Sequence, residues 1–199
     1  MRIRKILALL VLLSLALANV ASGAEPTTAI ETLRDFYKSY FRYLSRGTPN
    51  VKGPTLAMSD AFSKAAKKNR EICTTYSTSI CGWASDGDAY LDAQEIGPKL
   101  SLVNTGIKFV EIKPGLVQVS LNVYPSYKDA AYDRTITYKM VREKGRWVMD
   151  DVMYSDGVST VKNMEIENAE TIANPDPDSP AGKKRGLEGV CPVSPDPGR

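Results

Sequence analysis

The stretch VQVSLNV, residues 117–123, decides the fold class because its apolar and polar residues alternate without interruption. A period of two is typical of a β-strand with one buried face and one solvated face. Residues 107–113 lie just before it, and the intervening Pro114-Gly115 favours a tight turn. The two segments together predict an antiparallel hairpin.

Two more strands follow this hairpin. Residues 134–143 again carry apolar side chains on one side, and Lys144-Gly145 turns the chain into residues 147–154. We therefore expect four antiparallel strands in the second half of the chain.

Two helices precede these strands. Residues 28–46 begin with a capping box, in which the Thr28 hydroxyl and the Glu31 carboxylate satisfy the first free amides. Apolar and aromatic residues then recur at spacings of three and four, so this helix should bury one face. Ser59 is a suitable N-cap for a second helix over residues 59–76. Helices followed by an antiparallel sheet predict an α+β domain over residues 25–172.

The two ends of the chain differ in composition from this domain. Residues 1–24 carry a basic start, an apolar run of about 13 residues and small residues before Glu25, which is the layout of a cleaved signal peptide. The run is shorter than the roughly 20 residues that span a bilayer, so we expect a periplasmic protein without stable membrane insertion. No cysteine lies near the cut, so we do not expect a lipoprotein. Residues 173–199 contain six prolines and four glycines and are predicted to form a disordered tail.

Charge and composition argue against several functions. Three of the 26 basic residues lie in the first 24 positions, so the remaining 23 balance the 23 acidic residues. A neutral mature chain disfavours nucleic-acid binding, which needs a basic face. The chain contains no histidine, which excludes Ser-His-Asp and Cys-His catalysis and histidine-bound zinc. Without a glycine-rich phosphate loop or a complete metal-ligand set, we expect no cofactor.

Three cysteines are present in a chain that we expect to be exported. Cys73 and Cys81 are eight residues apart, which is about 12 Å along a continuous helix and too far for a disulfide. The Thr- and Ser-rich residues between them allow the chain to fold back. We therefore predict a Cys73–Cys81 disulfide, while Cys191 stays free or bridges two molecules.

Three segments resemble one bacterial family. They are ETLRDFYKSYFRYL (31–44), DAYLDAQE (88–95) and GRWVMDDVMY (145–154). Together they resemble the exported domain-of-unknown-function family numbered 3828, in the nuclear-transport-factor-2-like (cystatin-like) superfamily. The resemblance implies a cone-shaped roll, with N-terminal helices packed on a curved four-stranded antiparallel sheet and a pocket at its wide end. It implies no assigned reaction and does not cover residues 173–199.

Asp86, Asp88 and Asp92 belong to the densest carboxylate cluster of the sequence. Hard cations such as calcium prefer closely spaced oxygen ligands, so these residues are candidate metal ligands. The calcium-loop pattern is matched only at its first and third positions, since Tyr90 occupies the fifth. This mismatch favours the alternative that Asp88 is the N-cap of a short helix over residues 89–95.

Asp150 and Asp151 lie in the middle of the last strand, where consecutive side chains point to opposite faces. One of them should therefore face the interior or the pocket. There it acts either as a base with a raised pKa or, as we favour, as an acceptor of hydrogen bonds from Tyr or Arg. Together with Tyr90 these residues are the candidate binding residues, and no residue is assigned a catalytic role.

These observations favour an exported binding module that is monomeric or weakly dimeric. Its ligand is either a small apolar molecule or a cell-envelope protein, for example an exported toxin that it inhibits as an immunity protein. The alternative class is an isomerase or hydratase that uses carboxylate and tyrosine side chains. An isolated pocket acid with a donor opposite would favour the enzyme, and a pocket filled with aromatic rings would favour binding.

Overall fold

The computed structural model describes residues 28–47, 52–127 and 129–186. Its elements, in chain order, are α2 (Ala29–Arg46), α3 (Asp60–Tyr76), β1 (Lys108–Lys113), β2 (Leu116–Asn122), the short 3-10 helix η1 (Ala130–Tyr132), β3 (Asp133–Glu143), β4 (Arg146–Met153), α4 (Thr160–Ala173) and α5 (Pro180–Lys184). The strands form one antiparallel sheet in the order β1-β2-β3-β4. The predicted α+β fold is therefore confirmed. Within these ranges no helix combines the length and the apolar character needed to cross a bilayer.

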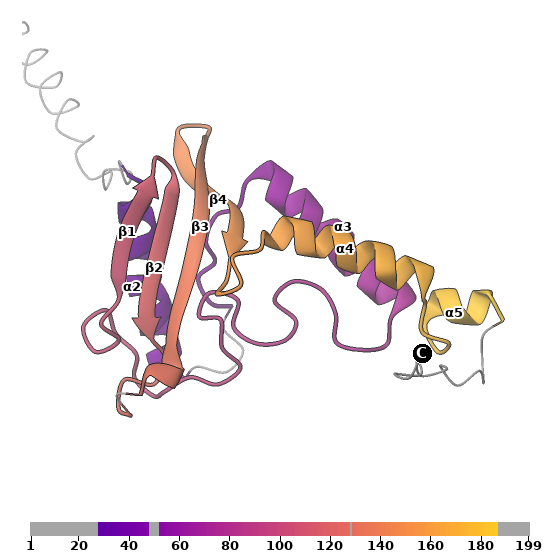
Figure 1. Ribbon diagram of the computed structural model, residues 1–199, viewed down its shortest axis with the longest axis horizontal. Coiled ribbons are helices and arrows are strands. Elements are labelled where there is room, and N and C mark those ends of the chain that lie inside the picture. The colour runs from indigo at the N-terminus through magenta and orange to yellow at the C-terminus, as the bar shows by residue number, and fades with distance from the viewer. Residues whose placement is uncertain (1–27, 48–51, 128, 187–199) are drawn as a thin grey trace, which may run out of the picture.

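Helix α2 lies across one face of the sheet, behind β1 and β2 in Figure 1, and no helix of the described residues covers the other face. Both ends of α2 form as the sequence predicts, with the Thr28–Glu31 capping box at its start and Gly47 in the left-handed conformation at its end. Strand β2 alternates as predicted, since Val117 and Val119 are fully buried while Gln118 and Ser120 are only partly covered. Period-two burial of this kind fits a sheet with one solvated face.

The space between α2 and the sheet is packed with aromatic rings. Tyr37 of α2 makes edge-on contacts with Phe36, Phe109 and Tyr138, at centroid distances between 5.4 and 6.4 Å. Its hydroxyl donates to the carbonyl of Tyr90 at 2.7 Å and lies 2.8 Å from the hydroxyl of Tyr138. Burial raises the pKa of Tyr37 and Tyr138 far above their usual value, so both hydroxyls stay neutral. Aromatic side chains therefore fill the space between α2 and the sheet.

The second predicted helix, α3, contacts the sheet at β4. It starts beside β4 and extends away from the sheet together with α4, as Figure 1 shows. The buried amide of Asn69 on α3 joins the two helices, since it donates to Glu167 at 2.7 Å and to Asn168 at 3.1 Å. Helix α4 was not predicted from the sequence.

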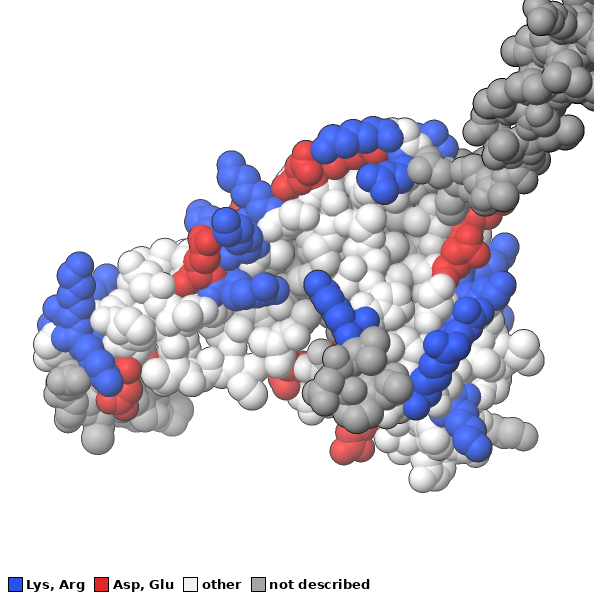
Figure 2. Space-filling model, turned by 180° about the vertical axis from the view of Figure 1, so that it is seen from behind, with Lys and Arg blue, Asp and Glu red and all other residues white. Residues whose placement is uncertain are grey.

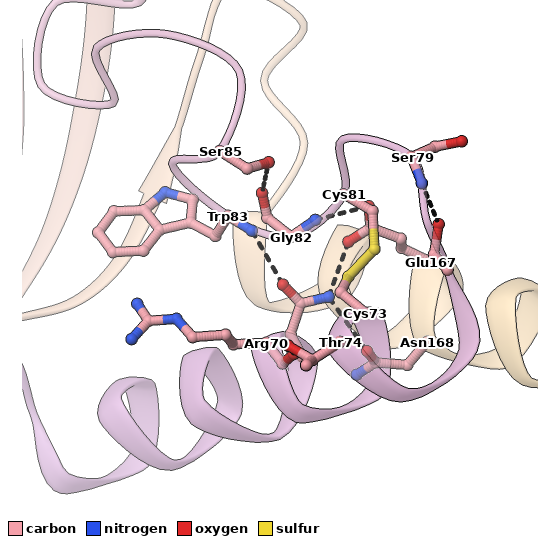
Figure 3. The surroundings of a disulfide bond; sticks show 12 residues. Arg70, Cys73, Thr74, Ser79, Cys81, Gly82, Trp83, Ser85, Glu167 and Asn168 are labelled. Carbon is pink, nitrogen blue, oxygen red and sulfur yellow. Dashed lines mark hydrogen bonds between the residues drawn. A yellow bond between two sulfur atoms is a disulfide. The ribbon is translucent and has the colours of Figure 1, made fainter. Parts of the chain in front are cut away.

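The predicted Cys73–Cys81 disulfide is confirmed, with the two Cα atoms 5.7 Å apart. The chain folds back at the end of α3, and Figure 3 shows the bond between the helix and the returning segment. That segment is also held by both helices, because Gly82 donates its amide to Glu167 at 3.1 Å and Trp83 donates its amide to Asn69 at 2.9 Å. The disulfide thus fixes the position of Trp83 against α3 and α4.

The structure differs from the predicted disordered tail, because residues 174–186 pack against the end of α3. The Asp176 carboxylate accepts hydrogen bonds from the amide and hydroxyl of Thr78 and from the hydroxyl of Ser77. Ser179, the N-cap of α5, is completely buried. Residues 187–199 with Cys191, and residues 1–27 with the predicted signal peptide, lie outside the described residues.

Truncation after Ala173 should lower the free energy of unfolding by about 1–3 kcal/mol, because it removes the buried Ser179 and the hydrogen bonds of Asp176 to Ser77 and Thr78, each worth about 0.5–1.5 kcal/mol. Truncation after Gly186 is the matched control and should leave stability unchanged, since it keeps all of these contacts. Urea denaturation of both truncated chains measures the difference. Equal stability of the two would show that residues 174–186 contribute nothing to folding.

Candidate functional site

A cavity of about 180 Å³ lies between the loop of residues 82–93 and Tyr154, which follows β4 directly. Aromatic rings and carboxylates share its wall. The lining residues are Gly82, Trp83, Ala84, Asp86, Gly87, Asp88, Ala89, Asp92, Ala93 and Tyr154.

The loop keeps its shape because Asp88 closes it from inside. The amide of Asp88 donates to the carbonyl of Ala93 at 2.8 Å, and its carboxylate accepts from the amides of Tyr90 at 2.9 Å and Leu91 at 3.2 Å. The hydroxyl of Tyr40 on α2 donates to the same carboxylate. Asp88 thus caps backbone amides as predicted, but residues 88–93 form a turn closed by a bridge between Asp88 and Ala93, and the short helix expected over residues 89–95 is not formed.

The aromatic side of the cavity is also fixed by hydrogen bonds. The indole nitrogen of Trp83 donates to the hydroxyl of Tyr154 at 3.2 Å, and that hydroxyl donates to the carbonyl of Ala89 at 3.0 Å. The Trp83 ring packs edge-on against Phe62 of α3, with centroids 5.0 Å apart. Burial raises the pKa of Tyr154 to about 12, so it stays a neutral hydroxyl.

The electrostatic character of the cavity is acidic, since three carboxylates and no Lys or Arg line it. Burial raises the pKa of Asp88, although the hydrogen bond from Tyr40 opposes the shift. Burial also raises the pKa of Asp92, and the positive charge of Arg134 opposes that shift. Asp86 is exposed and accepts from the Gln94 side-chain amide at 3.0 Å.

The structure brings Asp86, Asp88 and Asp92 to one cavity but does not make them converge on one point. Among the described residues, the group of three potential metal ligands whose sulfur or carboxylate oxygen atoms lie within 4.8 Å of one another is Cys73, Cys81 and Glu167. These two cysteines form the disulfide. Both oxygens of Asp88 already accept hydrogen bonds from the protein. The geometry therefore favours a structural role for Asp88 over metal binding.

Asp150 and Asp151 do not point one inward and one outward, because a β-bulge interrupts β4 at this position. Lys139 on β3 pairs with Asp151, and Met140, the next residue of β3, pairs with Met149. Asp150 therefore has no partner on β3 and is the extra residue of the bulge. A bulge of this kind breaks the alternation of side chains along a strand. Neither carboxylate contacts the tyrosines of the core.

Each of these carboxylates instead holds the N-cap of a helix. Asp150 accepts from the hydroxyl of Ser59, the N-cap of α3, at 2.8 Å and from the Lys139 ammonium at 2.7 Å. Asp151 accepts from the hydroxyl of Ser159, the N-cap of α4, and from the amide of Val161 at 3.2 Å. The hydrogen-bonded ammonium of Lys139 holds the pKa of Asp150 below its usual range. That direction is opposite to the raised pKa of a general base, and it supports the structural alternative.

Tyr90, the third predicted binding residue, does not line the cavity. Its ring is half-buried against Phe36 and Tyr40, with centroid distances of 4.7 and 5.3 Å. Sequence reasoning missed Trp83 and Tyr154, which come from separate segments and carry no motif. The spacing of Trp83 two residues after Cys81 was the one available sign that the disulfide would position it.

Comparisons with known proteins give relatives without an assigned activity, and no family model matches the sequence. The chain is 29% identical over 160 residues to the uncharacterized protein YqhG of Escherichia coli K12. The match covers 79% of this chain and 49% of YqhG, so the chain spans about half the length of this curated relative. A crystal structure of a protein of unknown function from Bacteroides thetaiotaomicron aligns with a TM-score of 0.39 and 17% identity, over 62% of this chain and 87% of that one. The resemblance to the nuclear-transport-factor-2-like superfamily stays a prediction.

Replacement of Asp150 by Ala should lower the free energy of unfolding by about 1–3 kcal/mol at pH 7, because Ser59 and Lys139 lose their acceptor. A carboxylate whose pKa is lowered in the folded state stabilises the protein above its unfolded pKa of about 3.9. This stabilisation is lost as the pH falls through the folded pKa, so the difference from the wild type should shrink below about pH 4.

Urea denaturation at pH 7 and pH 3 measures this difference. The exposed Asp178 serves as control, and Asp178→Ala should change stability by less than about 0.5 kcal/mol at either pH. The structural role of Asp150 is contradicted if its replacement leaves stability at pH 7 unchanged.

Proposed function

We propose that this chain is an exported binding module that takes a small organic cation, an ammonium or guanidinium group, in the cavity beside Trp83 and Tyr154. The observation that carries the proposal is the composition of the cavity wall, where three carboxylates and two aromatic side chains meet and no basic residue is present. A cation gains both from carboxylates and from the face of an indole or phenol ring.

The size of the cavity supports a charged headgroup over a larger ligand. Its volume of about 180 Å³ is below the roughly 300–1,000 Å³ of sites for drug-sized molecules. It corresponds to roughly six water molecules at about 30 Å³ each, which suits an ammonium or guanidinium group with a few carbon atoms.

Hydrogen bonding inside the cavity supports binding over catalysis. Asp88 has the raised pKa that a general base requires, but its oxygens accept from Tyr40 and two backbone amides. The hydroxyl of Tyr154 is likewise engaged with Ala89 and Trp83. An isomerase or hydratase would need an acid and a donor that are free to reach a substrate, whereas these groups maintain the shape of the loop.

Export is part of the same proposal. The signal-peptide pattern of residues 1–24 supports it, and so does the Cys73–Cys81 disulfide, since such bonds persist in oxidising compartments such as the periplasm. In that compartment the cation is either a free small molecule or a basic side chain of an envelope protein.

Tryptophan fluorescence tests the proposed site directly. The chain has two tryptophans, so Trp147→Phe leaves Trp83 in the cavity wall as the sole reporter. Titration of this variant with N-methylguanidinium should give a saturable change with a Kd in the millimolar range, about −4 kcal/mol. Asp86→Asn and Asp92→Asn should each weaken binding by about fivefold, which corresponds to roughly 1 kcal/mol, the upper end for a solvent-exposed ion pair.

Two controls accompany this titration. N-methylurea has the same shape without the charge and should give no saturable change, and Glu71→Gln on α3 removes a charge outside the cavity and should leave the Kd unchanged. An equal response to the neutral and the charged compound would contradict a cation site. So would an absence of any saturable response to the cation.

A further inference from the structure

The exposed side of α2 carries a row of basic residues at intervals of four. Arg34, Lys38, Arg42 and Arg46 are all exposed. A rise of 1.5 Å per residue puts successive members about 6 Å apart along the helix axis and extends the row over about 18 Å. Figure 2 views the molecule from the side that carries α2 and shows basic side chains in a slanted row there.

The last three residues of this row form no ion pair within the described part of the chain. No ion pair there joins Lys38, Arg42 or Arg46 to a carboxylate. Arg34 differs, because its guanidinium lies over the ring of Phe109 at 5.6 Å and the exposed Asp35 follows it. The three residues from Lys38 onward are therefore the part of the row that is available to a ligand.

Helix stability does not explain this arrangement. Like charges four residues apart destabilise a helix by about 0.2–0.5 kcal/mol for each pair, and the row contains three such pairs. A basic residue in the last turn interacts favourably with the helix dipole, which accounts for Arg46. That effect falls off within one turn, so it leaves Arg42 unexplained, whereas Lys38 has the exposed Asp35 three residues before it.

Two loops bring further basic residues beside the same part of the helix. Gly53 lies against the ring of Tyr43, which places the exposed Lys52 next to α2. The hydroxyl of Ser45 donates to the carbonyl of Leu100 at 3.2 Å, which places the exposed Lys99 on the other side. The row thus widens into a basic surface in a chain whose mature form has no net charge.

We propose that this basic surface binds a linear anionic polysaccharide that carries sulfate or uronate groups. The charges follow one line on a convex helix, which suits an extended chain of repeated anions. The apolar side of α2 is occupied by the core, with Leu33, Tyr37 and Phe41 buried, so the helix has no face to insert into a bilayer. Single-stranded nucleic acids bind by stacking their bases on exposed aromatic rings. The aromatic ring beside this basic surface is that of Tyr43, which is half-buried beneath Gly53 and therefore not open for stacking.

Binding of a heparin octasaccharide by the purified protein, measured by calorimetry at several salt concentrations, tests the proposal. Log K should fall linearly with log salt concentration, because bound polyanion releases counterions. Lys38→Glu/Arg42→Glu should weaken binding at least tenfold and reduce the salt slope by about two. These substitutions make two of the three pairs in the row opposite in charge, and only the pair at positions 38 and 42 keeps like charges, so the helix should remain folded, which circular dichroism verifies.

The matched control makes the same change of charge on another helix. Lys67→Glu/Lys68→Glu on α3 should weaken heparin binding less than threefold, since neither residue lies on α2. The proposal is overturned if both double variants lose affinity equally or if the octasaccharide does not bind at low salt. Preference for vesicles of phosphatidylglycerol, or for single-stranded DNA of equal charge, would also overturn it, in favour of a membrane or a nucleic acid.

Discussion

The arrangement of the molecule depends on two adjacent carboxylates that hold two helix N-caps. Asp150 binds the hydroxyl of Ser59 at the start of α3, and Asp151 binds the hydroxyl of Ser159 at the start of α4. A bulge supplies the extra residue that lets consecutive side chains of β4 serve both helices. Because both helices begin at the same point of β4, they lie side by side and share the contacts of Asn69. Those contacts and the disulfide position Trp83, so the cavity wall depends on the same pair of aspartates.

The sequence predicted the strands and helices whose buried residues recur at the regular spacing of a strand or a helix. Alternation of Val117 and Val119 with polar residues identified β2, and the aromatic residues of α2 identified the helix that covers the sheet. Helix α4 was missed because its buried residues are Thr160, Met164 and Asn168, two of which are polar. Their spacing of four is helical, but a hydrophobicity pattern does not detect buried polar residues.

Other predictions were wrong where hydrogen bonds of individual side chains, and not the local pattern of apolar and polar residues, determine the structure. The bulge at Asp150 breaks the expected alternation, and nothing in the sequence around it marks a bulge. The ordering of residues 174–186 depends on Asp176, whose partners Ser77 and Thr78 are almost 100 residues away. Composition describes how much apolar surface a segment can bury, and it does not reveal such distant polar contacts. For the same reason the sequence identified the acidic loop of the cavity but not its aromatic side.

Hydrogen exchange at the first turns of α3 and α4 tests most directly whether these aspartates anchor the two helices. The amide of Phe62 donates to Ser59 and the amide of Lys162 donates to Ser159, so both report on the caps. Asp150→Ala should accelerate exchange mainly in the first turn of α3 and Asp151→Ala mainly in the first turn of α4, while β1 and β2 keep their protection. Unchanged exchange in both first turns, or an equal loss of protection across the whole sheet, would contradict the account.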